Sequence, residues 1–191
     1  MTEKEKCAVG LLYDTTFPGR EEEHLRCADL CYDYNHTRPS DTSARESLLR
    51  QIFGSVGKQP YVEPNLFCGF GVNIHVGDFF FANNSCVFVD PGQITFGDYV
   101  FIGPNCGFYT AGHPLEPELR AKFLEYARPI TVGNHVWIGG GTTVCPGVSI
   151  GNNVVIGAGS VVTRDIPDNV VAFGNPCRVQ RPLESCKDET K

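Results

Sequence analysis

Residues 132–166 repeat a six-residue pattern without interruption. The first position of each unit is Val or Ile, at Val132, Ile138, Val144, Ile150, Ile156 and Val162. The fifth position is β-branched or small, at Val136, Thr142, Val148, Val154, Ser160 and Ile166, and four of the six units carry Gly second. A helix repeats about every 3.6 residues and a strand every two, so neither alone explains this period. A period of six is typical of a parallel β-helix, in which each unit supplies a short strand and a turn.

Three units form one triangular coil of eighteen residues, and successive coils stack through parallel backbone hydrogen bonds with a spacing of about 4.8 Å. The repeat also begins twice further upstream, at residues 76–78 and 96–98, and Phe96, Ile102 and Phe108 keep the period of six. Between these segments, the Asp-Pro-Gly sequence at residues 90–92 is interpreted as a corner that shifts their phase. The predicted fold is therefore an all-β solenoid, a parallel β-helix over residues 60–166.

Residues 1–59 lack the six-residue period and are predicted to form a helical cap over the open end of the β-helix. A first helix is expected over residues 20–35, with an apolar face made of Leu25, Ala28, Cys31 and Tyr32. A second is expected over residues 40–53, where Ser43-Ala44-Arg45-Glu46 fits a capping box. Residues 167–191 are predicted to leave the coil and pack back along it, with residues 182–191 frayed.

Residues 109–129 interrupt the repeat with an insertion that is expected to project from the β-helix as a loop. A loop of this length is usually functional or disordered. His113 lies within it, between Gly112 and Pro114, and an imidazole can take a proton from a hydroxyl near neutral pH. His113 is therefore a candidate general base, and the alternative is a surface histidine without a role in chemistry.

The chain of 191 residues has the length of one domain, and its net charge of −6 argues against binding to nucleic acid or to an anionic membrane. No apolar run approaches the roughly 20 residues that span a bilayer, and the charged N-terminus lacks the apolar core of a signal peptide. The nine cysteines form no Cys-x-x-Cys pair, which favours reduced thiols and a cytoplasmic protein over a disulfide framework.

Several motifs, in order along the chain, resemble those of the sugar O-acetyltransferases, a family that includes the galactoside, maltose and nodulation acetyltransferases. They are Tyr34-Asn35-His36, Gly71-Val72-Asn73-Ile74, Ala82-Asn83, Gly112-His113-Pro114, Val136-Trp137-Ile138-Gly139, the stretch 156–162 and Gly174-Asn175-Pro176-Cys177-Arg178. The resemblance covers about residues 8–182 and implies that the β-helix is left-handed. It also implies acetyl-CoA as the acetyl donor, no metal, and a homotrimer with its sites between subunits.

For the acceptor, the resemblance implies that His113 is the general base, that Asn83 orients the acceptor hydroxyl and that Trp137 lines the site. Further candidates for acceptor contacts are Asp14, Phe81, Asp90 and Glu125. Glu125 matches the maltose type of enzyme, whereas the galactoside type has an apolar residue there. Positions that contact sugar in the galactoside type hold Thr15, His24, Phe81 and Pro91 instead, with Asp14 and Arg20 nearby, which argues against galactoside specificity. Asn83 and Asp90 can alternatively be explained as turn residues.

For the donor, coenzyme A requires cations for its phosphates and a trough for its pantetheine arm. The resemblance assigns these roles to Arg164, Arg178 and Arg181 with Thr163 beside them, and to Gly139, Gly140 and Ala158 with Trp137. Guanidinium groups match phosphate geometry, and small residues permit close approach of the arm. The alternative for each arginine taken alone is a solvated surface charge.

The predicted reaction is direct transfer of the acetyl group to a hydroxyl of a sugar such as maltose, glucose or a galactoside. A non-sugar alcohol is an alternative acceptor. Two other classes of protein are compatible with the residues alone. A zinc hydratase on the same fold would need three converging histidines, for which His75, His113 and His135 are candidates. A non-enzymatic scaffold would need neither the insertion with His113 nor the set of arginines.

Overall fold

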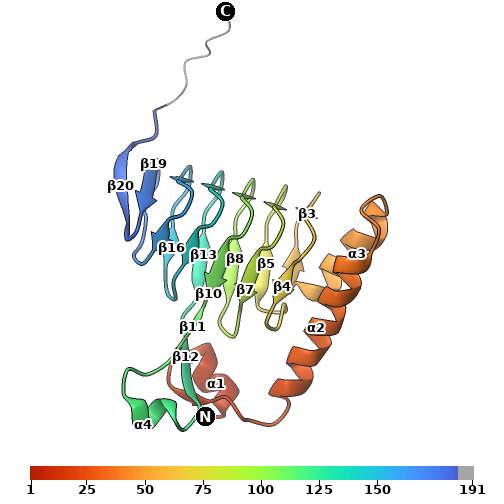
Figure 1. The fold of residues 1–191 in the computed structure, drawn as a ribbon, viewed down its shortest axis with the longest axis vertical. Helices are drawn as coiled ribbons and strands as arrows, with labels where there is room; N and C mark the ends of the chain where they lie inside the picture. Colours follow the sequence, from red (N-terminus) through yellow and green to blue (C-terminus); the bar gives the residue numbers. More distant parts are fainter. Residues whose placement is uncertain (185–191) are drawn as a thin grey trace, which may run out of the picture.

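Three sheets, one for each wall of a triangular prism, wind around the axis of the β-helix, and all their strand pairs except the last of the third sheet are parallel (Figure 1). The structure is a computed structural model that describes residues 1–184. It confirms the left-handed parallel β-helix that the repeat and the resemblance predict. The first wall consists of β2 (Ser55–Val56), β5 (Ile74–Val76), β8 (Ile94–Phe96), β13 (Ile130–Val132) and β16 (Ser149–Ile150).

In the other two walls, too, the strands follow one another along the axis in the order of the sequence. The second wall consists of β4 (Phe67–Cys68), β7 (Val87–Val89), β10 (Gly107–Tyr109), β15 (Thr143–Val144) and β18 (Val161–Val162). The third wall consists of β3 (Tyr61–Val62), β6 (Phe81–Ala82), β9 (Phe101–Ile102), β14 (Trp137–Ile138), β17 (Val155–Ile156), β19 (Val170–Gly174) and β20 (Cys177–Pro182). Each of the five coils from β2 to β18 therefore contributes one strand to each wall, and β19 and β20 extend the third wall.

The register between coils repeats the period of the sequence. Val132 pairs with Ile150, so neighbouring coils in the uninterrupted repeat are eighteen residues apart, as predicted. Upstream, Val76 pairs with Phe96, so these coils are twenty residues apart. The coil from Val76 to Phe96 contains the corner between β7 and β8, where Asp90 is buried. This corner produces the phase shift that the sequence indicates.

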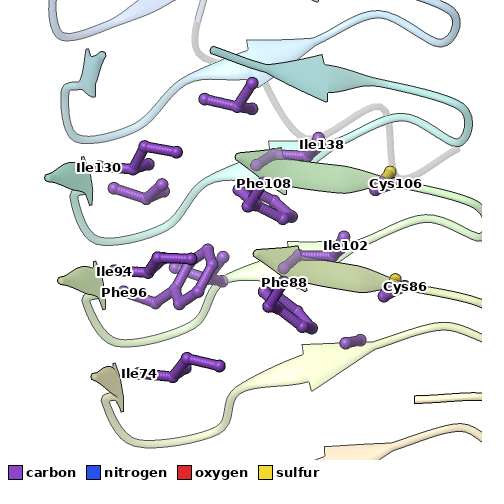
Figure 2. Close-up of a cluster of buried hydrophobic side chains, with 14 of the residues drawn as sticks. Ile74, Cys86, Phe88, Ile94, Phe96, Ile102, Cys106, Phe108, Ile130 and Ile138 are labelled. Atoms are coloured by element: carbon purple, nitrogen blue, oxygen red, sulfur yellow. The ribbon is translucent and has the colours of Figure 1, made fainter. Parts of the chain in front are cut away.

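The inward-facing positions of the repeat form one continuous apolar core (Figure 2). Every first- and fifth-position side chain of residues 132–166 is buried. In the upstream coils the core contains phenylalanine rings: Phe88 stacks on Phe108 with 5.3 Å between ring centroids, and Phe96 meets Phe108 edge-on at 5.1 Å. Burial of each such ring stabilises the fold by about 1.5 to 3 kcal/mol. The packed core therefore fixes where the outward-facing side chains of each wall lie.

Both predicted N-terminal helices are present, as α2 (Arg20–His36) and α3 (Thr42–Ile52). The predicted apolar face of α2 is wrong for two of its residues, because Leu25 and Tyr32 are exposed. The residues of α2 that are buried in the core are Cys27, Cys31 and Tyr34. Packing against the end of the β-helix thus selects a different face of the helix from the one that composition suggests.

The second helix has a different cap from the predicted one. Asp41 precedes α3, and its carboxylate accepts a hydrogen bond from the backbone N–H of Ala44 at 3.1 Å. The capping box predicted at Ser43 is wrong because Asp41 takes the capping position two residues earlier.

The N-terminal segment and the insertion are more regular than the sequence predicts. The N-terminal segment contains α1 (Glu3–Ala8) and β1 (Tyr13–Asp14), and the insertion contains β11 (Ala111–Gly112), α4 (Pro117–Arg120) and β12 (Leu124–Ala127). β12 pairs antiparallel with both β1 and β11, which forms a three-stranded sheet beside the β-helix. The insertion is therefore not a free loop, because the N-terminal segment holds one edge of it.

The C-terminal segment extends the third wall and then turns back. β19 pairs parallel with β17, and β20 pairs antiparallel with β19. At the other end, β2 already pairs with β5, so the first coil begins before residue 60. Pro182 is the last residue of β20. The frayed end is predicted over residues 182–191, of which residues 185–191 lie outside the described residues. Within residues 1–184, no helix is long and apolar enough to cross a membrane.

Candidate active site

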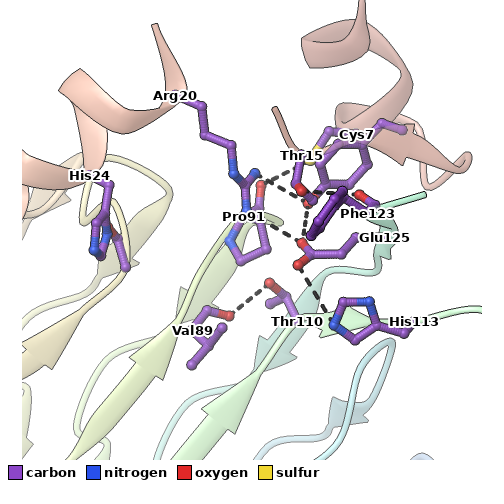
Figure 3. Close-up of polar contacts among 12 residues, drawn as sticks. Cys7, Thr15, Arg20, His24, Val89, Pro91, Thr110, His113, Phe123 and Glu125 are labelled. Carbon is purple, nitrogen blue, oxygen red and sulfur yellow. Dashed lines mark hydrogen bonds and ion pairs between the residues drawn. The ribbon is translucent and has the colours of Figure 1, made fainter. Parts of the chain in front are cut away.

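His113 follows β11 directly and lies on the ribbon formed by β11 and β12 (Figure 3). Its Nδ1 lies 3.2 Å from the backbone oxygen of Leu124, and its Nε2 lies 3.8 Å from Oε1 of Glu125. The contact with Leu124 assigns the hydrogen to Nδ1, because a carbonyl oxygen can only accept. In the neutral imidazole, Nε2 then carries the lone pair, on a side chain that is 54% exposed. A general base requires this combination of a free lone pair and access for the substrate.

Glu125 on β12 divides its two carboxylate oxygens between two sets of neighbours. Oε1 faces His113, whereas Oε2 accepts a hydrogen bond from the Tyr13 hydroxyl at 2.9 Å and lies 3.3 Å from Nη2 of Arg20. Burial, and then the charge of Glu125, raise the pKa of Tyr13 well above its usual range, so its hydroxyl remains a donor. The negative charge of Glu125 is thus held beside the imidazole, where it favours the protonated form that a base generates.

The sequence does not predict that Tyr13 and Arg20 contact Glu125. Tyr13 lies directly opposite Glu125 in the pair of β1 and β12, and a strand of two residues has no readable alternation. Arg20 is the first residue of α2, where the helix dipole favours acidic side chains over basic ones. Arg20 is a basic residue at a position where acidic residues are preferred. This is the one signal in the sequence that could have drawn attention to it.

A hollow of about 430 Å³ opens beside Glu125, and we call it the Glu125 hollow. Its apolar lining is Phe67, Phe70, Val89, Pro91 and Ala111, and its polar lining includes Thr15, Arg20, Glu21 and His24. Three of these polar side chains already have partners, since Arg20 pairs with Glu125 and the other two contact the backbone. The Thr15 hydroxyl donates to the backbone oxygen of Phe123 at 3.0 Å. Nδ1 of His24 lies 2.8 Å from the backbone oxygen of Gly69. The hollow is therefore largely apolar, with the carboxylate at its edge.

A second hollow of about 430 Å³ lies on the outer face of the third wall, and we call it the Trp137 groove. It brings together these predicted site residues: Phe81, Asn83, Trp137, Gly139, Gly140 and Ala158. Trp137 is 57% exposed and forms part of an open apolar floor. Gly139 also has a structural reason, because a Cβ there would lie 2.5 Å from the backbone nitrogen of Ala158 in the next coil. Stacking of the coils therefore requires this glycine with or without a ligand.

The predicted phosphate-binding cations lie at the C-terminal end of the β-helix. Arg178 and Arg181 are on β20, and Thr163 and Arg164 follow β18, which contacts β20. All four side chains are exposed. In the part of the chain that the structure describes, none of these arginines forms an ion pair with an acidic side chain. Their charges are therefore available to a phosphorylated ligand.

Two candidates for acceptor contacts lie in neither hollow. Asp14 accepts hydrogen bonds from the backbone N–H and the hydroxyl of Thr16, at 2.8 and 2.7 Å. Asp90 is fully buried and accepts from the backbone N–H groups of Phe70 and Gly71, at 2.9 and 2.8 Å. Asp14 therefore stabilises its own turn, whereas Asp90 joins its corner to the backbone of the preceding coil.

In a single chain, His113 and the Trp137 groove lie on different sides of the β-helix. The insertion leaves the second wall after β10 and returns to the first wall at β13, so it emerges at the corner opposite the third wall. The Trp137 groove lies on that third wall. The base and the groove therefore face different sides of a single chain.

The three histidines of the zinc alternative do not converge. His75 lies on β5 with Nδ1 3.0 Å from the Ser55 hydroxyl, and the ring of His135 stacks on Tyr99. Within residues 1–184 there is no group of three His, Cys, Asp or Glu side chains that could hold a metal ion. Nothing in the described residues therefore supports a zinc hydratase.

Two family models match the chain. The maltose acetyltransferase hexapeptide capping motif matches residues 6–57, and the bacterial transferase hexapeptide model, with six repeats, matches residues 129–164. The first covers the helical cap and the second covers the uninterrupted repeat, so together they match the two parts of the fold.

Known acetyltransferases are similar to this chain over almost its whole length. The galactoside O-acetyltransferase of Escherichia coli K12 is 46% identical, over 94% of this chain and 88% of that protein. A maltose O-acetyltransferase from Clostridium difficile 630 superimposes with a TM-score of 0.95 and 50% identity, over 97% of this chain and 99% of that one. A galactoside acetyltransferase solved with coenzyme A has a TM-score of 0.94 and 46% identity, over 96% and 92% of the two chains.

The coiled fold, the repeat and these similarities define a hexapeptide-repeat acyltransferase that takes acetyl-CoA as its donor. Within that class, the chain belongs to the galactoside and maltose O-acetyltransferase family. The predicted family, enzyme class and donor are thereby confirmed, and the protein is not a non-enzymatic scaffold.

Proposed function

We propose that the protein transfers the acetyl group of acetyl-CoA to a hydroxyl of a sugar acceptor, with His113 as the general base. The observation that carries this proposal is the pair of contacts made by the imidazole. Nδ1 lies against the backbone oxygen of Leu124, and Nε2 is left beside the carboxylate of Glu125. A base is needed because a neutral hydroxyl attacks a thioester poorly until its proton is removed.

The proposed reaction is a direct transfer in a ternary complex. Nε2 of His113 takes the proton of the acceptor hydroxyl as that oxygen attacks the thioester carbonyl carbon. The imidazolium that forms is stabilised by Glu125, at 3.8 Å. The tetrahedral intermediate then expels coenzyme A as a thiolate, which takes the proton back from Nε2. Each turnover returns a neutral imidazole and releases one thiol.

We assign the Trp137 groove to the pantetheine arm of the donor. The floor of Trp137, Gly139 and Gly140 is open and apolar, which suits an alkyl amide chain. The exposed guanidinium groups of Arg164, Arg178 and Arg181, with Thr163, would bind the phosphates. Asn83 lines the groove close to Phe81, and its amide can both donate to and accept from an acceptor hydroxyl.

We infer that the complete site forms between copies of the chain in a homotrimer. His113 and the Trp137 groove lie on different sides of one chain, so a second copy must bring its histidine to the groove of the first. The outer face of the third wall also carries exposed aromatic side chains, with Phe101 45% exposed and Trp137 57% exposed. An apolar face of this kind is typical of a surface that a partner covers.

A non-sugar alcohol remains the second candidate acceptor. The Glu125 hollow is lined largely by apolar side chains, and Thr15 and His24 already bond to the backbone. A polyhydroxylated acceptor would therefore find few free partners in that hollow.

All eight cysteines of the described residues are free thiols, which supports the proposed cytoplasmic location.

The experiment that tests the proposal is an acceptor screen with acetyl-CoA, in which released thiol is measured with and without each acceptor. Glucose, maltose, a galactoside and simple alcohols would be compared at equal concentration. The proposal predicts thiol release that depends on a sugar acceptor. Release with simple alcohols alone would favour the second candidate, and no acceptor-dependent release would contradict both.

A further inference from the structure

The geometry points to Arg20 and Tyr13 as positioning residues that hold the carboxylate of Glu125 beside His113. This inference rests on the proposed function, because it assigns His113 the role of base. Within residues 1–184, neither Arg20 nor Tyr13 forms a hydrogen bond with His113. They act through Glu125, whose second oxygen they share. Figure 3 shows Glu125 between Arg20 and His113.

The contacts of Glu125 leave one oxygen for the imidazole. The Tyr13 hydroxyl and Nη2 of Arg20 both approach Oε2, at 2.9 and 3.3 Å, and Nη1 of Arg20 lies 3.4 Å from that hydroxyl. The three groups form a closed triangle that fixes the rotation of the carboxylate. Oε1 then points to His113 because Oε2 is occupied.

The surroundings of Arg20 make this ion pair stronger than an ordinary surface pair. The side chains of Arg20 and Glu125 are only 19% and 17% exposed. The guanidinium carbon also lies over the rings of Phe70 and Tyr13, at 4.9 and 5.5 Å from their centroids. Rings on these sides restrict the guanidinium and reduce its contact with water, so its charge is less screened.

The backbone of the N-terminal segment supports the same arrangement. Tyr13 pairs with Glu125, and Asp14 pairs with Leu124, whose oxygen contacts Nδ1 of His113. A segment more than one hundred residues away in sequence thus holds both neighbours of the histidine. This explains why β1 and the start of α2 are built onto the insertion.

Four titratable groups surround the carboxylate of Glu125: His113 from the β11–β12 ribbon, Arg20 from α2, Tyr13 from β1 and Cys7 from α1. Burial raises the pKa of both Tyr13 and Cys7, so these two are neutral near pH 7. Arg20 is therefore the fixed positive charge that offsets Glu125. Without it, the full charge of Glu125 would act on the imidazole and favour its protonated form.

The direct test is an NMR titration of the His113 ring, whose signal is identified by its loss in His113→Ala. Arg20→Met should move the midpoint of this titration to higher pH by about 0.5 to 1 unit. Arg20→Lys restores the charge and should return the midpoint close to that of the wild type. Glu125→Gln should move it to lower pH. Arg26→Met, on the exposed side of the same helix, is the matched control and should leave it unchanged.

A purely structural role for Arg20 would not produce opposite shifts in Arg20→Met and Glu125→Gln. Tyr13→Phe provides a second variant, since it keeps the buried ring and removes only the hydroxyl. Without this hydrogen bond, the carboxylate of Glu125 should be held less firmly in its orientation. The variant should therefore have a kcat about tenfold lower, with an unchanged KM for acetyl-CoA. An unmoved midpoint in Arg20→Met, together with wild-type kcat in Tyr13→Phe, would overturn the inference.

Kinetics separate this inference from the proposed function. If the wild type transfers acetyl groups but Arg20→Met changes only the acceptor KM, Arg20 binds the acceptor and the positioning role is wrong. If the wild type shows no acceptor-dependent thiol release, the proposed function fails, and the NMR midpoints still decide whether Arg20 controls the charge beside His113.

Discussion

Nε2 of His113 and Oε1 of Glu125 lie 3.8 Å apart across the ribbon of β11 and β12. This distance is too long for a hydrogen bond but within the range of an ion pair with an imidazolium. The carboxylate therefore does not need to receive a proton to assist the base. Its charge favours the imidazolium while the thioester is attacked.

Glu125→Gln should lower kcat by about tenfold or more and move the acid limb of the pH–rate profile to lower pH. The amide keeps the shape of the side chain but removes the charge that favours the imidazolium. The measurement is kcat and kcat/KM for the acceptor between about pH 5 and pH 9. The control is Glu118→Gln, on the exposed helix α4, which should behave as the wild type. A profile that superimposes on that of the wild type would remove Glu125 from the mechanism.

The double variant Arg178→Ala and Arg181→Ala should bind coenzyme A about 10- to 100-fold more weakly. Loss of hydrogen bonds to charged phosphate oxygens costs about 1.5 to 3 kcal/mol each, and exposure of the arginines reduces this value. Calorimetry with coenzyme A measures the effect directly, and the acceptor KM should stay unchanged. Unchanged affinity would mean that both arginines are ordinary surface charges.

His113→Ala and Trp137→Ala should complement each other if the site lies between subunits. Each variant alone lacks one half of every site, but a mixed trimer contains some interfaces in which both residues are intact. Light scattering should first give one species of about three times 21.0 kDa. Activity should then return in part after the two variants are refolded together. Mixed samples no more active than either parent would contradict a shared site, as would a fully active monomer.

Stability should depend on pH through Asp90. Burial raises the pKa of Asp90 to about 7, against about 3.9 in an unfolded chain, although backbone N–H groups oppose the shift. A carboxyl group with a raised pKa in the folded state stabilises that state fully below about pH 4. This contribution, roughly 4 kcal/mol at most, is lost as the pH rises to about 7.

The corresponding measurement is the free energy of unfolding in urea at about pH 5 and pH 8, for the wild type and Asp90→Asn. The variant is expected to be less stable at both values, because the amide nitrogen cannot accept the bond from Gly71. It should, however, lose the fall in stability between the two pH values. Parallel curves for the two proteins would show that Asp90 is not the titrating group.

The β-helix could be predicted from the sequence because its signal is repeated. Val132 and Ile150 occupy equivalent places in successive coils, and every unit between them carries the same pattern. The existence of α2 and α3 was equally clear from helix-forming segments before the repeat. The buried face of α2 could not be predicted, because packing on the end of the β-helix, which buries Cys27, decides it.

The site could be predicted only in the parts that motifs carry. His113 stands between Gly112 and Pro114 in an insertion that interrupts a strict repeat, so the sequence itself draws attention to it. Tyr13 and Arg20 have no such context, since their contact with Glu125 depends on two-residue strands that pair across most of the chain. Pairing of this kind is set by tertiary structure and leaves no local pattern.

The most direct test of the account is the turnover of His113→Ala in the acceptor-dependent thiol assay. Loss of a general base should lower kcat by about 10² to 10⁴, while affinity for coenzyme A and thermal stability remain those of the wild type. His36→Ala, at the exposed end of α2, is the matched control and should keep full activity. Near-normal kcat in His113→Ala, under conditions where His36→Ala and the wild type are equally active, would contradict the assignment of His113 as the base.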